Sequence, residues 1–369
     1  MTSVRLFISL PASQHWPLHQ LDIKSALLHG DLQEEVYMEQ PPGFVAQGEY
    51  GKVCHLKKFL YSLRQSPCAW FDKFSEVQKF GLRKGQCDHL VFYRNSDISI
   101  ILLVVYVDDI VITGNDSTGI SSLKNYLHAS FHTKDLGQLK YFLGVEILRS
   151  KRGILLSHRN YVLDLLAETG KIGAKPCSTS MIPNICLTKD DGDPYDNLER
   201  YRSLVGKLNY LMVMTRLDIA FAVSVVRQFI PALTVKHWAA LEQILCYRKG
   251  TPRLGILYKD YGHAALECFS DVDWVEFKSD RRSITGYCVF IGGNLVSWKS
   301  KKQNVVSRSS AESKYRAIAQ STCEILWINY LLKEVGMMLH HPRNFGVIIR
   351  LLFTLLSIQY TMNGLSILK

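Results

Sequence analysis

The chain has 369 residues, of which 47% are hydrophobic and 11% aromatic, and it carries 44 Lys and Arg against 33 Asp and Glu. This composition excludes a disordered chain and supplies enough apolar residues for two or three packed domains. The positive surplus of +11, with a pI near 9.1, favours a polyanionic partner, nucleic acid before membrane.

Cysteine usage and apolar runs set further bounds. The nine cysteines are scattered without CxxC pairs or zinc-finger spacing, so we expect free thiols in a reducing compartment. The first apolar run is too short for a secretory signal. The runs at 98–107 and 347–358 are too short or too interrupted to supply the ~20 apolar residues of a membrane-spanning helix. The sequence predicts an intracellular protein without a membrane segment.

The front of the chain mixes predicted strands and helices. Alternating or continuous apolar residues predict strands, and an apolar stripe at helical spacing predicts a helix. The expected strands are 17–23, 33–44, two runs within 98–114 and a pair over 136–150, and the expected helices are 66–82 and 119–131. Together these elements predict an α+β arrangement.

The rest of the chain changes pattern twice. Helical spacing dominates from 154 to 250, and a polar stretch at 187–197 predicts a surface loop. Short alternating runs from about residue 253 predict a strand meander. A long helix is then predicted to begin near Ser309. Its expected inward-facing residues are Ala311, Tyr315, Ile318, Thr322, Ile325 and Leu326.

Two adjacent aspartates, Asp108 and Asp109, interrupt the apolar run 98–114. Two carboxylates ~4 Å apart repel by about 4 kcal/mol at an effective dielectric of 20. Either the pair lies at a hairpin turn open to solvent, or a cation offsets the charge. A third carboxylate, Asp22, ends the strand 17–23, and Mg²⁺ is commonly held by two or three carboxylates plus substrate phosphates. Two such ions suit in-line displacement at phosphorus.

Several sequence blocks occur in a fixed order. "QLDIKSALLHGDLQEEVYMEQPPGF", "LYSLRQSPCAWF", "YVDDIVITG" and "KDLGQLKYFLGVEI" are followed by "YRSLVGKLNYL", "FSDVDW" and "SRSSAESKYRAIA". From about residue 3 to 341 the chain resembles the reverse transcriptase and ribonuclease H region of copia-type retrotransposon Pol polyproteins of plants. The resemblance implies an RNA-directed DNA polymerase that acts on an RNA or DNA primer–template and dNTPs. It implies a cytoplasmic location, within virus-like particles, or a nuclear one.

The resemblance also implies the domain order. Residues 1–150 would be a polymerase palm, an antiparallel sheet with helices, without the fingers segment that precedes it in the family. Residues 151–252 would be a helical thumb and connection, and 253–341 an incomplete ribonuclease H-like α/β domain. Residues 342–369 read like the family's next block translated out of frame, so we expect a frameshifted tail without the last carboxylates.

The first site follows from the same match. Asp22, Asp108 and Asp109 would be the catalytic residues and the ligands of two Mg²⁺ or Mn²⁺ ions. Consecutive strand residues point to opposite faces, so a tight turn is what lets both adjacent aspartates approach one site.

Four further residues are expected near the nucleotide. Tyr106 would lie under the primer end, and Leu27 stands where the family usually has an aromatic residue that excludes a ribonucleotide's 2′-hydroxyl. Arg64 and Gln65 are candidates for nucleotide or template contact. An ordinary solvated surface is an equally open interpretation for these last two.

A second metal site is expected to be depleted. Asp271 resembles the first ribonuclease H carboxylate, but the second, a glutamate just before a helical tyrosine, is replaced by Lys314. Glu312 lies two residues earlier and about 200° around the helix, which makes it a poor substitute. Asp273 is either an additional ligand or a turn carboxylate.

The resemblance therefore implies an impaired or inactive polymerase and a lost ribonuclease H activity. Two alternatives stay open. One is a non-catalytic nucleic-acid-binding remnant, and the other is a decayed product with no role.

Overall fold

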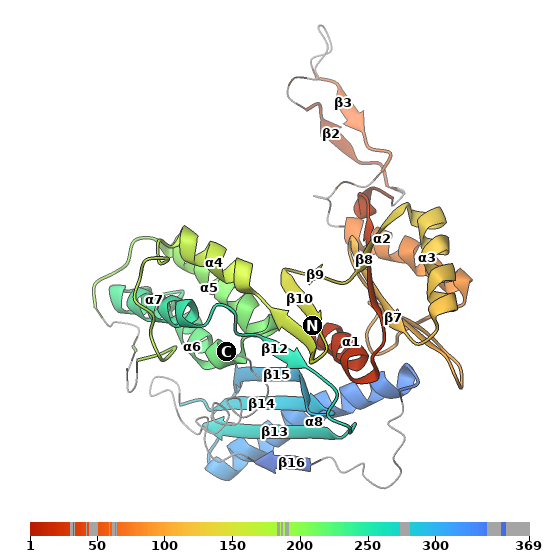
Figure 1. Ribbon diagram of the computed structural model, residues 1–369. Helices are drawn as coiled ribbons and strands as arrows, with labels where there is room; N and C mark the ends of the chain where they lie inside the picture. The colour runs from red at the N-terminus through yellow and green to blue at the C-terminus, as the bar shows by residue number, and fades with distance from the viewer. Residues whose placement is uncertain are drawn as a thin grey trace. The chain divides into compact units, whose positions relative to one another are not determined.

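The chain folds into two compact units. A computed structural model describes it apart from residues 30–31, 33, 42, 44–50, 59, 61–62, 64, 183–184, 186, 189–191, 274–280, 338–347 and 352–369. One unit comprises Trp16–Leu139 and Leu331–Met337 and is called the 16–139 unit. The other comprises Met1–His15, Lys140–Tyr330 and Met338–Lys369 and is called the 140–330 unit. Figure 1 shows the elements of both.

The 16–139 unit is built on a six-stranded antiparallel sheet in the order β4-β5-β6-β7-β1-β8. Its strands are β1 (Leu18–Ile23), β4 (Arg83–Lys84), β5 (Val91–Asn95), β6 (Ile100–Tyr106), β7 (Asp109–Gly114) and β8 (Thr133–Gln138). The strands predicted at 17–23 and within 98–114 are therefore confirmed. The nearly continuous apolar runs of β6 and β7 are buried along almost their whole length, as expected for central strands.

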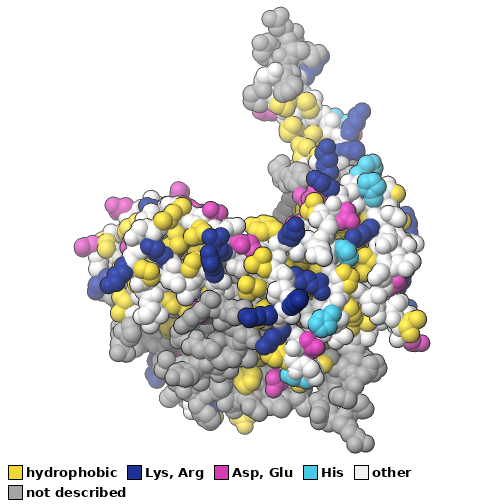
Figure 2. Space-filling model, viewed as in Figure 1, with side chains coloured by type: hydrophobic (Ala, Val, Ile, Leu, Met, Phe, Trp, Pro, Cys, Tyr) yellow, Lys and Arg dark blue, Asp and Glu magenta, His cyan; other side chains and the backbone are white. Residues whose placement is uncertain are grey.

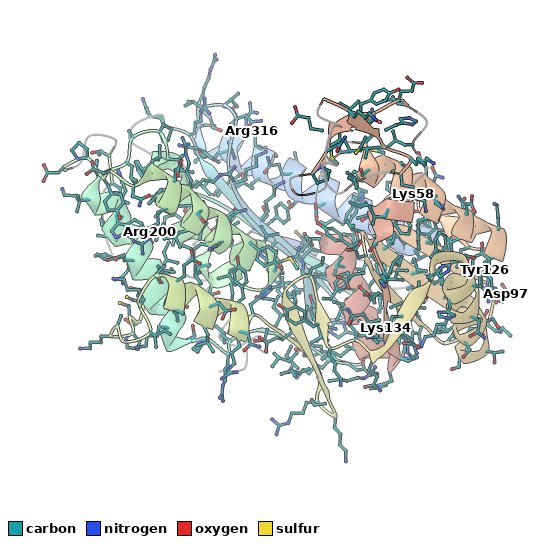
Figure 3. All side chains as sticks on the ribbon, turned by 90° about the horizontal axis from the view of Figure 1, so that it is seen from above. Lys58, Asp97, Tyr126, Lys134, Arg200 and Arg316 are labelled. Atoms are coloured by element: carbon teal, nitrogen blue, oxygen red, sulfur yellow. The ribbon has the colours of Figure 1, made fainter. Side chains whose placement is uncertain are left out.

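Two helices cover one face of this sheet. They are α2 (Ser66–Phe74), continued by the 3₁₀ helix η2 (Ser75–Phe80), and α3 (Ser117–Phe131). The core between helices and sheet contains alternate residues of the strands together with aromatic residues of the helices. Its members include Leu21, Ile23, Trp70, Phe74, Phe92, Ile101, Leu103, Val105, Ile110, Ile112 and Phe131. On the helical side, the ring of Tyr126 lies 5.3 Å from that of Phe80, and its hydroxyl donates to the Glu76 carbonyl (3.2 Å; Figure 3).

A separate two-stranded sheet lies within the same unit. It pairs β2 (Tyr37–Glu39) antiparallel with β3 (Val53–His55). All three residues of β2 are exposed, so this hairpin contributes little to the core.

The 140–330 unit begins with a second sheet and a group of helices. The sheet has the order β12-β11-β10-β9 and consists of β9 (Tyr141–Phe142), β10 (Val145–Ser150), β11 (Gly153–Ser157) and β12 (Ile256–Tyr258). The helices are α4 (Arg159–Glu168), α5 (Leu198–Met214), α6 (Ala220–Val226) and α7 (Val235–Gly250), with short 3₁₀ turns η3 (Leu217–Ile219) and η4 (Arg227–Phe229). Their apolar faces form one core.

A third sheet completes this unit, in the order β15-β14-β13-β16. Its strands are β13 (Leu266–Asp273), β14 (Ile284–Ile291), β15 (Asn294–Lys302) and β16 (Ile348–Leu351), of which β16 pairs parallel with β13 and the others pair antiparallel. The amino-terminal helix α1 (Thr2–Gln14) packs in this unit. Its buried Arg5 donates to the Val296 carbonyl (Nε, 2.9 Å) and lies over the Trp298 ring at 3.7 Å.

The long helix α8 (Ser310–Glu334) begins where the sequence predicted. Of its predicted inward-facing residues, Ile325 is buried and Ile318 and Thr322 are half-buried, but Ala311, Tyr315 and Leu326 are exposed. Tyr315 is 73% exposed and Leu326 is 47% exposed. The buried residues are instead Ser313, Ala317, Ser321, Ile325, Ile328, Leu331 and Leu332. Gln303 of the loop after β15 donates to the Ser313 carbonyl at 3.0 Å. Small side chains let a helix backbone approach its neighbours closely. A prediction from the apolar pattern gives most weight to large residues and therefore misses the small residues on the buried face of the helix.

The α+β class predicted from the sequence is confirmed, with several antiparallel sheets in both units. Among the described residues, no helix is both long and apolar enough to cross a membrane.

A buried histidine gives the 140–330 unit a pH dependence. His158 is 1% exposed, and its Nδ1 lies 2.8 Å from Thr215 Oγ1. Burial, helped by the charge of Arg216, lowers the pKa of His158 to about 4. Between pH ~6.5 and ~4 the unfolded chain therefore binds a proton that the folded chain does not, and the free energy of unfolding should fall by about 3 kcal/mol.

Urea unfolding of this unit at pH 7 and near pH 4 measures that loss. Replacement of His158 by Gln, which keeps a polar partner for Thr215, is expected to remove most of it. An equal acid loss in wild type and H158Q would assign the effect to other groups.

Candidate active site

The acidic pair lies at the tight turn that joins β6 to β7. Tyr106 pairs with Asp109, so Val107 and Asp108 alone form the loop of a two-residue hairpin. Val107 has φ 53°, a left-handed conformation that is rare and strained for a β-branched residue. The indole Nε1 of Trp70 donates to the Val107 carbonyl at 3.0 Å. A core side chain thus supports a turn that its own sequence disfavours.

The strand register places the acidic residues on one face of the sheet. Asp22 of β1 pairs with Asp109 of β7, and residues paired directly across strands point to the same side. Their neighbours Leu21, Ile23 and Ile110 belong to the core under the helices. Asp22 and Asp109 therefore lie on the opposite face, away from α2 and α3.

Asp108 is held close to the other two carboxylates by the turn. Its carbonyl accepts a hydrogen bond from Ile23 N (2.8 Å), which ties the turn to the end of β1. Burial, followed by the charges of Asp22 and Asp109, raises the pKa of the Asp108 carboxyl. A hydrogen bond from the Ala26 backbone opposes that rise in pKa. Within the described part of the chain, the buried Asp108 Oδ1 has no hydrogen-bond partner.

Asp109 has a partner that the sequence interpretation missed. Gln20 Nε2 donates to Asp109 Oδ1 at 3.1 Å. Burial and the charge of Asp22 raise the pKa of Asp109, and the Gln20 hydrogen bond opposes them. Gln20 stands two residues before Asp22 on the same strand face, so the period of two would have identified it as a neighbour.

A cation also flanks this face. Lys134 of β8 lies directly across from Asp22 in the strand pairing, and Figure 3 labels it. Lys134 is exposed. Its ammonium therefore adds a positive charge at the edge of the acidic face.

The residues present have the chemistry of a divalent-cation site. An unpartnered buried carboxylate oxygen on Asp108, next to two more carboxylates of the same charge, is stabilised by a hard cation. Among the described residues, however, no three His, Cys, Asp or Glu side chains are already gathered into a metal-binding cluster. Carboxylate oxygens are the ligand type that such ions prefer.

The other predicted site residues have different surroundings. Tyr106 is 38% exposed at the end of β6, on the same face as Asp109. Leu27 is only 5% exposed, in the 3₁₀ helix η1 (Ala26–His29), and packs within the core. Gln65 is the residue just before α2, and its Nε2 donates to Glu34 Oε2 at 3.0 Å. Arg64 lies outside the described residues.

The expected second site lies at the end of β13. Asp271 and Asp273 are two residues apart, so both point to one face of the third sheet. Burial raises the pKa of Asp271, whereas a Val272 backbone hydrogen bond and the charge of Lys314 lower it. Burial and the charge of Asp271 raise the pKa of Asp273 to about 6. Among the described residues, the buried Asp271 Oδ2 has no hydrogen-bond partner.

Glu312 is held outside this second site. Its carboxylate accepts from Arg308 N (2.8 Å) and from Arg316 Nη2 (2.8 Å) on the surface of α8 (Figure 3). The charge that approaches Asp271 from this helix is therefore the Lys314 ammonium.

Comparison with known protein families identifies a reverse transcriptase region in the front half of the chain. The family model described as "Reverse transcriptase (RNA-dependent DNA polymerase)" matches residues 1–183. Over 342 residues the chain is 42% identical to the Retrovirus-related Pol polyprotein from transposon RE1 of Arabidopsis thaliana, covering 92% of this chain and 23% of the relative. Over 347 residues it is 38% identical to the corresponding TNT 1-94 polyprotein of Nicotiana tabacum, covering 91% of this chain and 26% of the relative.

A shorter relative is aligned over almost its whole length. An uncharacterized mitochondrial protein of Arabidopsis thaliana is 39% identical over 228 residues, which are 61% of this chain and 93% of that protein. The chain belongs to the copia-type retrotransposon Pol polyprotein family and contains its reverse transcriptase region. It spans about a quarter of the length of the Pol polyproteins that it matches.

Proposed function

We propose that the chain is an RNA-directed DNA polymerase fragment that catalyses two-metal nucleotidyl transfer at an impaired rate. The observation that supports this proposal is the cross-strand placement of Asp22 and Asp109 beside the Asp108 turn, with one carboxylate oxygen unpartnered within the described chain. In this proposal residues 1–150 are the palm, 151–252 the thumb and connection, and 253–341 an incomplete ribonuclease H-like domain.

The reaction is attack of a primer 3′-hydroxyl on the α-phosphate of a dNTP. Asp22, Asp108 and Asp109 would hold two Mg²⁺ or Mn²⁺ ions, which when bound offset the charge on the attacking and leaving oxygens. Gln20 orients Asp109 through its hydrogen bond. The Val107 turn positions Asp108, and the exposed Tyr106 ring offers a surface for the primer end.

One feature affects the choice of sugar. Leu27 is packed in the core, where it presents little surface to a nucleotide sugar. Discrimination between ribose and deoxyribose should therefore be weak.

For the rear of the chain we propose a ribonuclease H-like domain without activity. The three antiparallel strands β13, β14 and β15 and the helix α8 that follows them support the fold assignment. Hydrolysis at phosphorus with two metal ions needs several carboxylates, whereas Lys314 brings a positive charge toward Asp271. The predicted frameshifted tail, 342–369, lies outside the described residues except for β16.

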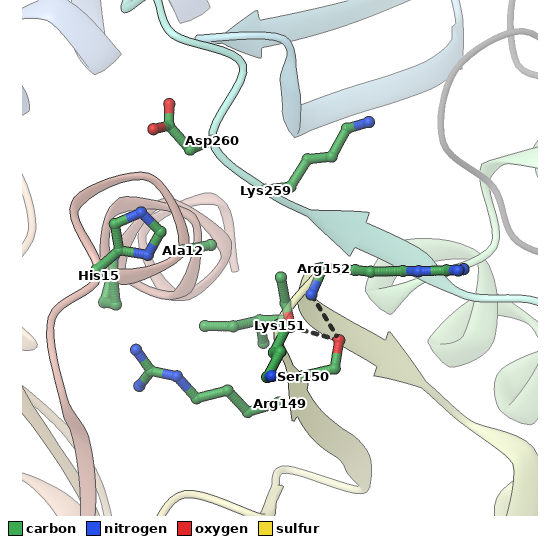
Figure 4. A pocket seen from close by; sticks show the side chains of 11 residues that line it. Ala12, His15, Arg149, Ser150, Lys151, Arg152, Lys259 and Asp260 are labelled. Atoms are coloured by element: carbon green, nitrogen blue, oxygen red, sulfur yellow. Dashed lines mark hydrogen bonds between the residues drawn. The ribbon is translucent and has the colours of Figure 1, made fainter.

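A second candidate function is nucleic-acid binding without catalysis. A pocket of about 210 Å³ in the 140–330 unit is lined by four cations, Arg149, Lys151, Arg152 and Lys259, against the single carboxylate of Asp260. Within the described chain, none of the four cations forms an ion pair. Figure 2 shows Lys and Arg gathered over this face, and in Figure 4 the labelled cations fan out around the pocket. A spread of unpaired cations suits an extended polyanion.

One pair of experiments separates the two functions. Primer extension on poly(A) with Mg²⁺ or Mn²⁺ measures catalysis, and fluorescence anisotropy of a labelled primer–template measures binding. Incorporation of dTMP supports the polymerase. Salt-sensitive binding without incorporation contradicts it and supports the binding remnant, and absence of both supports a decayed product.

The basic pocket makes a separate prediction about binding. Arg149→Gln combined with Lys259→Gln should weaken binding of a single-stranded oligonucleotide about tenfold in low salt and flatten its salt dependence, because two phosphate contacts are lost. Arg202→Gln with Arg227→Gln removes the same charge from exposed positions outside the pocket. Equal losses in the two double variants would show that net charge, and not the pocket, governs binding.

A further inference from the structure

A segment of turns and irregular backbone runs along helix α7 within the 140–330 unit. This segment, residues 171–181, is called the strap. At its start Lys171 forms an ion pair with Glu242 (Nζ to Oε1, 2.7 Å), and further along the Lys249 ammonium donates to the Ala174 carbonyl. Glu242 and Lys249 lie seven residues apart, on one face of the helix. The strap is therefore fixed along that face by charged side chains.

Two cysteines meet at the middle of this contact. The amide of Cys177 in the strap donates to the carbonyl of Cys246 in α7 at 3.3 Å. The Cys177 thiol donates to Gln243 Oε1 at 3.4 Å, and it is close enough to the Cys246 thiol to raise the pKa of that thiol. Gln243 Nε2 in turn donates to the Thr179 carbonyl at 3.1 Å. The Cys177 thiol is thus held by a glutamine that is itself bonded to the strap.

This geometry suits a covalent link. A disulfide needs Cα atoms ~4.4–6.8 Å apart with the side chains facing each other. The direct hydrogen bond from Cys177 N to the Cys246 carbonyl brings the two backbones close together. Both cysteines are free and half-buried. They are therefore close enough to join and exposed enough to meet a small oxidant.

We propose that Cys177 and Cys246 form an intramolecular disulfide under oxidising conditions, which locks the strap onto α7. With oxidised glutathione, the Cys177 thiolate attacks one glutathione sulfur, forms a mixed disulfide and releases one glutathione thiolate. The Cys246 thiolate then attacks the Cys177 sulfur and releases the second. One protein S–S bond replaces one glutathione S–S bond, and the two thiol protons end on the two glutathione molecules.

The ionisation of Cys246 sets the pace of this exchange. Burial, helped by the neighbouring Cys177 thiol, raises the pKa of Cys246, so its thiolate is scarce at neutral pH. The closing step should accelerate about tenfold per pH unit between pH 7 and 9, because the thiolate fraction rises tenfold per unit below the pKa. The disulfide is therefore expected to form slowly at neutral pH.

A second pair of cysteines serves as an internal control, because the two residues are close in the fold but their side chains point apart. Cys268 and Cys288 lie on the neighbouring strands β13 and β14, but Cys268 pairs with Val289 and Cys288 pairs with Phe269. Their side chains therefore point to opposite faces of the sheet and are not expected to join. Both are also buried.

The full chain, incubated with oxidised glutathione, is digested without reduction and mapped by mass spectrometry. The expected product is a peptide pair joined at Cys177 and Cys246, absent after reduction, and a rise in melting temperature of roughly 5–10 °C, because the bond closes a long loop. Cys246→Ser should instead retain one glutathionyl group on Cys177. A Cys268–Cys288 link, or links from Cys177 to other cysteines at equal yield, would overturn the proposal. The peptide map also distinguishes links made by Cys177 from links made by Cys186, which lies outside the described residues.

Discussion

Asp108→Asn is expected to abolish stabilisation of the chain by Mn²⁺ and to lower any primer extension by at least ~100-fold. The amide removes a charged ligand from the turn while keeping its size and one oxygen. In the folded chain, burial and two neighbouring carboxylates raise the pKa of Asp108. The ionised form therefore opposes folding at neutral pH, and its removal should raise the melting temperature of the metal-free chain by ~1–3 °C.

The sign of this stability gain follows from the direction in which the pKa of Asp108 is shifted. A carboxyl with a raised pKa in the folded state costs stability above its ordinary pKa of ~4, and it costs nothing at a pH where both states are protonated. The gain from Asp108→Asn should thus be present at pH 7 and vanish below pH ~3. Thermal unfolding with and without millimolar Mn²⁺, over this pH range, measures both effects.

Asp97→Asn is the matched control for this experiment. Asp97 is exposed at the turn between β5 and β6 of the same unit (Figure 3). Its replacement changes the net charge equally but removes no group from the acidic face. If both variants kept the response to Mn²⁺, Asp108 would not be a ligand and the proposed polymerase mechanism would fail.

Trp70→Ala should cost the 16–139 unit about 3–5 kcal/mol of unfolding free energy, the usual range for a buried aromatic residue. Trp70 is 2% exposed, and its ring lies 5.6 Å from that of Phe74 and 5.8 Å from that of Phe131. Its loss removes the centre of this aromatic cluster together with the hydrogen bond to Val107. Urea unfolding followed by circular dichroism measures the change.

Two milder variants separate packing from support of the turn. Trp70→Phe keeps an aromatic ring but loses the 3.0 Å bond from Nε1 to the Val107 carbonyl, at a cost of about 1 kcal/mol. Phe131→Leu disturbs the same cluster and leaves that bond intact. Hydrogen exchange of the β6–β7 hairpin amides should accelerate in Trp70→Phe more than in Phe131→Leu. Equal acceleration would show that Trp70 supports the turn only through packing.

The strands and the acidic triad could be predicted from the sequence because the relevant information is local. An apolar run interrupted by Asp108 and Asp109 carries its own periodicity, and Asp22 ends a strand of the same kind. The α+β class and the family follow from several such blocks in order. The periods of strands and helices need no knowledge of what lies across the fold.

The inward face of α8 could not be predicted in the same way. Hydrophobicity favoured Tyr315 and Leu326, but these are exposed, and the small residues Ser313, Ala317 and Ser321 are among the buried ones. A close approach between a helix and its neighbours favours small side chains regardless of their polarity. Which stripe of the helix is close to its neighbours is a property of the assembled unit.

The sequence by itself determined the family, the carboxylates of the candidate site and most of the elements that carry them, because these follow from residue order and local periodicity. Only the tertiary structure decided which distant groups control those residues. Trp70 supports the Val107 carbonyl, Lys314 reaches Asp271, and Cys177 meets Cys246 across 69 positions of the chain. Contacts of this kind depend on how separate elements pack, and no local pattern encodes that packing.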